Sequence, residues 1–147
     1  MQLTLETTFP VEPDALFAVC ASREGFVGHV PFPVRWHAGP SSWRDDDVID
    51  FSFRMFGLWS RYVARITHFV PGKTFTDEMQ TGIYRRCRHT HRFEAHPDGT
   101  RLVDIVDFTL GYGAAIDRTI GLPLLRRTFR DRHALLRRLL DRGAIPC

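Results

Sequence analysis

Two histidines that stand two positions apart, His89 and His91, are the residues of this sequence best suited to chemistry. Residues at positions i and i+2 of a strand point to the same face, so both imidazoles would share one face. Asp77 and Asp104 lie in the segments before and after them, and both segments have the alternation of strands. Imidazoles beside carboxylates can transfer protons near neutral pH, and such a set can also bind zinc or iron.

The turn between the second and third of these segments predicts which side chains meet. Residues 96–99, HPDG, have the composition of a four-residue hairpin connection. With such a turn, His91 faces Asp104 and Phe93 faces Leu102 across two antiparallel strands. Directly opposed side chains on one face are close enough to interact, so we predict a contact between His91 and Asp104.

Three interpretations of this polar group follow from its chemistry. The two histidines with Asp77 and Asp104 could hold a metal ion. His91 and Asp104 could instead be the catalytic acid–base pair of a cyclase or dehydratase. A buried polar group also needs hydrogen-bond partners for structural reasons alone, and this is the interpretation that we favour. We therefore expect no bound metal and no cofactor, and we expect Cys87 on the same face to be an inert buried thiol.

The composition is that of one soluble domain spanning residues 1–147. The chain is 44% hydrophobic and 25% charged, and its length allows a sufficient core without disulfides. The net charge is only +3, and nearly all the basic residues are Arg, with Lys73 as the single Lys. Such an arginine bias does not by itself predict nucleic-acid binding, and we expect none.

The expected location follows from the cysteines and the terminal sequence. Cys20, Cys87 and Cys147 have neither zinc-ligand spacing nor the spacing of a disulfide framework, so we expect reduced thiols. The first residues lack the pattern of a signal peptide, and no segment approaches the ~18 apolar residues that span a bilayer. We expect a cytoplasmic protein without stable membrane insertion, as a monomer or homodimer.

Hydrophobic periodicity predicts a strand, two short helices, six further strands and a long final helix. In chain order these are strand 2–9, helices 13–20 and 23–29, strands 34–43, 48–56, 59–70, 73–80, 84–95 and 100–110, and helix 114–142. Pro123 should kink or divide the final helix, and Gly143 should end it. The expected fold is α+β, with a seven-stranded curved antiparallel sheet wrapped around the long C-terminal helix.

Four short motifs of this sequence resemble the SRPBCC superfamily, which includes START-like and pollen-allergen-like domains. They are Phe75-x-Asp77-x-x-Gln80-x-Gly82, Arg88-His89-Thr90-His91-Arg92-Phe93, Gly99-Thr100-x-Leu102-x-Asp104 and Phe129-x-x-Arg132-His133. The sequences of these motifs are similar to those of the bacterial ligand-binding proteins of the polyketide cyclase/dehydrase-like group. The resemblance covers nearly the whole chain and implies the helix-grip fold.

These observations together predict that the chain binds a small hydrophobic molecule, lipid-like or polyketide-like. The expected cavity lies between the sheet and the C-terminal helix, with the histidines and aspartates as its polar end. The residues expected to contact the ligand are Phe51, Phe53, Tyr62, Asp77, Cys87, His89, His91, Phe93, Asp104, Phe108 and Phe129. Two alternatives stay open: a cyclase or dehydratase that uses His91 and Asp104, and an interaction module whose basic helix face, with Arg126 and Arg130, recruits a partner.

Overall fold

The computed structural model describes residues 1–143. The strands are β1 (Gln2–Phe9), β2 (Val34–Ala38), β3 (Val48–Met55), β4 (Leu58–Val70), β5 (Thr74–Thr81), β6 (Arg86–His96) and β7 (Gly99–Thr109). The helices are α1 (Pro13–Cys20), α2 (Arg23–His29), α3 (Ala114–Ile116), the π-helical turn η1 (Asp117–Gly121) and α4 (Leu122–Asp141). The predicted order of elements is confirmed.

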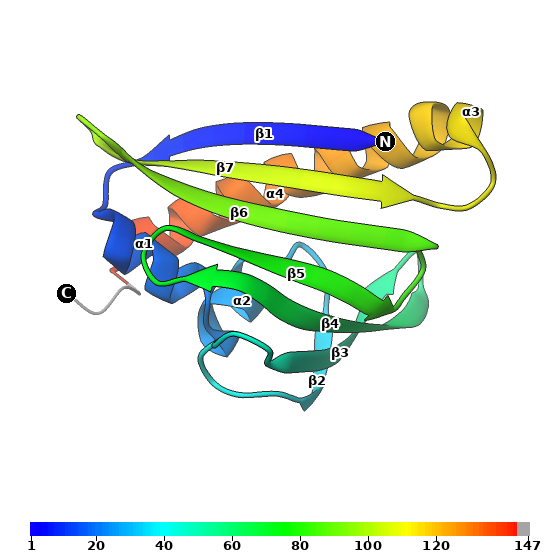
Figure 1. Cartoon of the computed structure of the whole chain (residues 1–147), viewed down its shortest axis with the longest axis horizontal. Coiled ribbons are helices and arrows are strands. Elements are labelled where there is room, and N and C mark those ends of the chain that lie inside the picture. The colour runs from blue at the N-terminus through cyan, green and yellow to red at the C-terminus, as the bar shows by residue number, and fades with distance from the viewer. Residues whose placement is uncertain (144–147) are drawn as a thin grey trace.

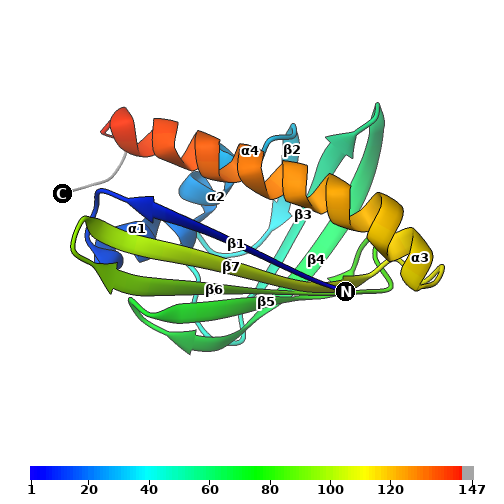
Figure 2. The ribbon, with the colours of Figure 1, turned by 90° about the horizontal axis from the view of Figure 1, so that it is seen from above.

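The seven strands form one antiparallel sheet in the order β1-β7-β6-β5-β4-β3-β2. The first strand therefore pairs with the last, while α1 and α2 cross from β1 to the opposite edge of the sheet (Figure 1). Seen from above, the long helix lies across the concave face of the curved sheet (Figure 2). This is the predicted helix-grip architecture. None of the helices that the structure describes is long and apolar enough to span a membrane.

The register of β6 and β7 confirms the predicted pairs, in which His91 is opposite Asp104 and Phe93 is opposite Leu102. The connection is shorter than predicted, because His96 already pairs with Gly99 and leaves only two residues in the turn. Gly99 has a φ of 134°, and a Cβ atom there would lie 2.2 Å from a backbone oxygen of β1. This glycine therefore allows the hairpin to pack against the end of the first strand.

The final helix is interrupted just before Pro123, as predicted. The regular α-helical pattern changes to the π-helical turn η1, and α4 then begins with Pro123 in its first turn. Proline is tolerated there because its missing N–H is not needed. At Gly121 the helix approaches the sheet so closely that a Cβ atom would lie 2.7 Å from the ring of Phe108. Gly143, with a φ of 67°, follows the helix end as predicted.

The strict alternation that we predict for β4 fails at one position. The pattern places His68 on the face of Ala64 and Ile66, both of which are fully buried, but His68 is exposed. Its φ is 49°, and the pairing of β4 with β5 shifts register between Thr67 and Val70. A bulge therefore turns His68 away from the core, so this prediction was wrong.

Two hydrophobic clusters lie between the sheet and the helices. The larger cluster contains Phe9, Phe17, Phe75 and Phe93 and is completed from the helix by Leu136. The smaller cluster lies near the other end of α4 and contains Leu3, Cys87, Val106, Phe108, Leu125 and Phe129. Cys20 and Cys87 are buried free thiols, whereas Cys147 lies outside the described residues.

Candidate functional site

A cavity of about 120 Å³ lies between the sheet and α4. Its sheet wall comes from β3 to β7, and its helix wall from one side of α4. Phe26 of α2 and the residues Val30, Pro31 and Phe32 that follow this helix also line the cavity. Most of the lining is apolar or aromatic. The acidic and basic side chains that face the space are those of Asp77, His89, His91 and Arg132.

The structure brings most of the predicted ligand-contacting residues to this cavity. Those that line it are Phe51, Phe53, Tyr62, Asp77, Cys87, His89, His91 and Phe129. The other three lie elsewhere. Phe93 packs edge-on against Phe17 in the larger cluster, and Phe108 lies under the close approach of Gly121. Asp104 is only 4% exposed and lies behind the two histidines, because its carboxylate bonds to their rings.

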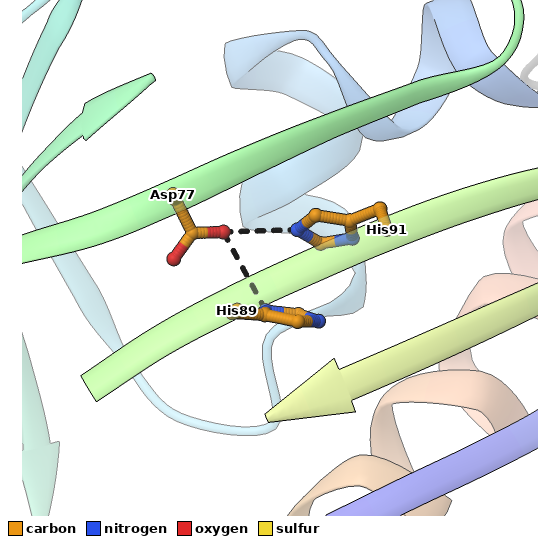
Figure 3. Close-up of side chains that lie close together, drawn as sticks. All are labelled: Asp77, His89 and His91. Atoms are coloured by element: carbon orange, nitrogen blue, oxygen red, sulfur yellow. Dashed lines mark hydrogen bonds and ion pairs between the residues drawn. The ribbon is translucent and has the colours of Figure 1, made fainter. Parts of the chain in front are cut away.

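The side chains of Asp77 on β5 and of His89 and His91 on β6 converge (Figure 3). Oδ2 of Asp77 is 2.9 Å from Nε2 of His91 and 3.5 Å from Nδ1 of His89. The second nitrogen of each ring points to Oδ1 of Asp104, at 2.8 Å from His89 and 3.0 Å from His91. Each imidazole is therefore held between two carboxylates, one facing the cavity and one behind it.

A third histidine, His133 of α4, completes the group from the helix side. Its Nε2 is 2.5 Å from the second carboxylate oxygen of Asp104, and its Nδ1 is 2.6 Å from the hydroxyl of Thr7 on β1. Both oxygens of Asp104 are thus occupied by imidazoles. We predicted neither His133 nor Thr7 as part of the site, although His133 follows the apolar residues of α4 at helical spacing, at i+4 from Phe129.

The charges of this group depend on which neighbours each ring has. Burial alone would lower the pKa of His91, but its hydrogen bonds to Asp104 and Asp77 raise this pKa above the ordinary value. Burial and the adjacent His91 lower the pKa of His89. Burial disfavours the charged form of Asp104, yet the surrounding imidazoles hold its pKa well below the usual range. The carboxylates therefore favour the protonated form of His91 over that of His89.

Arg132 is the one charged residue that reaches the cavity from the helix. Its guanidinium donates a hydrogen bond of 3.0 Å to Nε2 of His29, which is a buried residue at the end of α2. The ring of His29 donates from Nδ1 to the carbonyl of Gly25 at 2.6 Å. Among the described residues, no carboxylate forms an ion pair with Arg132. Helical periodicity predicts Arg132 among the arginines that mostly fill the outer side of the helix, whereas the structure turns it toward the cavity.

Cys87 is a buried thiol in the cavity wall. Burial and the nearby Asp77 raise the pKa of its thiol to about 12, so almost no thiolate exists at neutral pH. The remaining groups at the cavity can bind a cation through Asp77 and the imidazoles, bind an anion through Arg132, or move a proton at His91.

Comparisons with known proteins identify solved structures with a similar fold and low sequence identity. No family model and no curated protein matches the sequence. Among solved structures, the protein TTHA0849 from Thermus thermophilus aligns with a TM-score of 0.79 at 13% identity, covering 97% of this chain and 99% of that one. CV1439 from Chromobacterium violaceum aligns with a TM-score of 0.77 at 14% identity, covering 95% and 96% of the two chains.

Ara h 8.0201, a helix-grip protein, is a further structural neighbour, with a TM-score of 0.69 at 16% identity. The alignment covers 96% of this chain and 98% of that one. Coverage this high in both directions means that the likeness extends over nearly the whole of both chains. Identities this low carry no information about ligand or activity, because one fold can support many functions.

Proposed function

We propose that this protein binds a small, mainly apolar molecule in the cavity under α4. The observation that carries the proposal is an apolar cavity toward which a few polar groups converge, with Asp77 and His91 on one wall and Arg132 on another. This combination is typical of ligand sites, in which apolar walls supply affinity and few polar groups set orientation.

The size of the cavity favours a compact ligand. Its volume of about 120 Å³ is near that of cavities that hold a single aromatic ring. A lipid-like or polyketide-like molecule would place one ring or a short chain segment here and extend through the opening. Ile83 and Phe32 both belong to the lining, and Ile83 is 42% exposed, so the cavity reaches the surface beside it.

Arg132 favours a ligand with an anionic group. A guanidinium offers several donors in a fixed plane and matches a carboxylate in two-point contacts. One of its donors is already used by His29, and that bond fixes the group at the cavity wall. Rings of Phe26 and Phe129 lie 5.8 and 4.9 Å from the guanidinium carbon and hold it from the sides.

Filling the cavity tests the proposal. Thr128 lines the cavity and Thr119 is exposed, and the hydroxyl of each bonds only the carbonyl four residues earlier. We expect Thr128→Phe to weaken the binding of benzoate by at least about tenfold, and Thr119→Phe to leave it unchanged. Benzyl alcohol, which lacks the charge, should bind more weakly than benzoate to the wild-type protein.

Titrations followed by nuclear magnetic resonance would measure these affinities, and native mass spectrometry of freshly purified protein would reveal a natural ligand. Equal affinity of both variants for benzoate, or a wild-type protein that binds neither probe, would contradict the proposal.

A second candidate is a cyclase or dehydratase, favoured by the position of His91 in the cavity wall beside Asp77. Asp104 lies behind the rings, so in this proposal it orients His91 while Asp77 and His91 face the substrate. An Asp beside a His can tune the imidazole for proton transfer. Turnover of a bound molecule that survives His91→Gln unchanged would exclude this role.

A further inference from the structure

The group formed by Asp77, His89 and His91 has a geometry that hydrogen bonding alone does not require. Nδ1 of His89 lies 3.5 Å from Oδ2 of Asp77, which is longer than an ordinary N–H···O hydrogen bond. The ligand atoms of all three residues lie within 4.8 Å of one another. Two donor atoms bound to one ion at about 2.0–2.1 Å are roughly 3.0–3.4 Å apart, close to the 2.9 and 3.5 Å found between Asp77 and the rings.

The nitrogens that face away from this group are held as those of metal-binding histidines usually are. Such histidines donate the N–H of their other nitrogen to a carboxylate, which fixes the ring and its tautomer. Nε2 of His89 and Nδ1 of His91 both point to Oδ1 of Asp104, at 2.8 and 3.0 Å. Asp104 is itself fixed by His133. Both rings therefore present their remaining nitrogens toward Asp77 and the cavity (Figure 3).

We propose that Asp77, His89 and His91 form a binding site for a divalent transition-metal ion, such as Zn²⁺ or Fe²⁺. Two imidazoles and one carboxylate suit these ions, whereas Mg²⁺ and Ca²⁺ prefer sites made of oxygen ligands. Three protein ligands leave further coordination positions of the ion open, and here these positions face the cavity. The partly exposed carboxylate of Asp77 and the buried carboxylate of Asp104 provide the negative charge that a dication needs.

This inference goes beyond the binding of an apolar molecule and does not depend on it. A metal ion at the floor of the cavity would offer a direct bond to an oxygen or nitrogen atom of whatever enters. The path to the site runs through the cavity itself, since the side chain of Asp77 is 17% exposed while those of His89 and His91 are 5% and 7% exposed.

The test uses the whole chain, freed of metal by a chelator and then dialysed against Zn²⁺. We expect one Zn²⁺ per chain by elemental analysis, and calorimetry should show binding weakened by at least about 100-fold in Asp77→Asn. Glu78→Gln is the matched control, because it removes the same charge from the next residue of β5. In the wild-type protein the carboxylate of Glu78 forms an ion pair with Arg88 at 3.5 Å, away from the proposed metal site. This variant should bind Zn²⁺ as tightly as the wild-type protein.

A second measurement locates the ion. Titration with Zn²⁺ should change the imidazole nitrogen signals of His89 and His91 in nuclear magnetic resonance spectra and leave those of the exposed His37 and His68 unchanged. Co²⁺ should give the visible absorption of a site with nitrogen and oxygen ligands. The proposal is overturned if the wild-type protein retains no Zn²⁺ after dialysis. It is also overturned if Asp77→Asn binds as tightly as Glu78→Gln, or if only the exposed histidines respond.

Discussion

Two regions of this molecule bury histidines with opposite consequences. In the sheet, His91 lies between the carboxylates of Asp77 and Asp104, and these raise its pKa. At the contact of α2 with α4, His29 faces the guanidinium of Arg132. Burial, followed by that positive charge, lowers the pKa of His29 to about 3. Both rings belong to residues that are 5% exposed, so burial alone does not decide whether a histidine is charged.

The two regions differ in function for the same reason. The imidazole of His91 can hold a proton or, after losing it, a metal ion, because carboxylates stabilise either positive charge. The imidazole of His29 is a permanent acceptor at neutral pH, so it can hold an arginine in place without competing with it for a proton. The cavity therefore has an acidic wall in the sheet and a basic one at the helix.

The largest expected effect is that of Asp104→Asn, which removes the charge that three imidazoles share. Breaking a buried charged network in this way should lower the free energy of unfolding by about 3–5 kcal/mol. Asp107→Asn is the control, since Asp107 lies on the opposite face of β7 and pairs with Arg86 at the surface. That change should cost less than about 1 kcal/mol. Equal midpoints in urea denaturation would show that the network does not stabilise the fold.

The pH dependence of stability tests the other region. Between the ordinary histidine pKa of 6.5 and about 3 the unfolded chain protonates His29 and the folded protein does not, so stability falls as the pH falls. His29 should contribute a loss of about 1.4 kcal/mol for each pH unit in this range. His29→Gln keeps an acceptor for Arg132 but cannot titrate, and its stability should fall less steeply with acid. Parallel curves for wild type and variant in urea denaturation would contradict this account.

The smallest effect should come from Asp77→Asn in the metal-free protein. Asp77 borders the cavity, and asparagine keeps an oxygen that can accept from His91. The free energy of unfolding should therefore change by about 1 kcal/mol. A loss as large as that of Asp104→Asn would show that the two carboxylates contribute equally to stability. It would remove the distinction between Asp104, which lies behind the rings, and Asp77, which faces the cavity.

The strands and their register could be predicted from the sequence. The depth of the Asp104 side chain below the cavity and the rotation of α4 about its axis could not. Alternation and a short turn place His91 opposite Asp104, as the structure confirms. They do not show that the carboxylate lies behind the rings, because that depends on the side-chain angles of both residues. The contribution of the helix was missed for a related reason. Periodicity predicts that α4 is amphipathic, but its rotation against the sheet decides that His133 and Arg132 point inward.

The bonds of His133 have a consequence for how the chain folds. They join Thr7 of the first strand to Asp104 of the last strand through a residue of the final helix. Because α4 is the last element of the chain, the seven strands can pair before it docks. In that state Asp104 lacks its bond to His133, and the concave face of the sheet is exposed to water. Contacts so distant in sequence form late in folding. We therefore expect the docking of α4, which covers the concave face and supplies His133 to Asp104, to be a late step of folding.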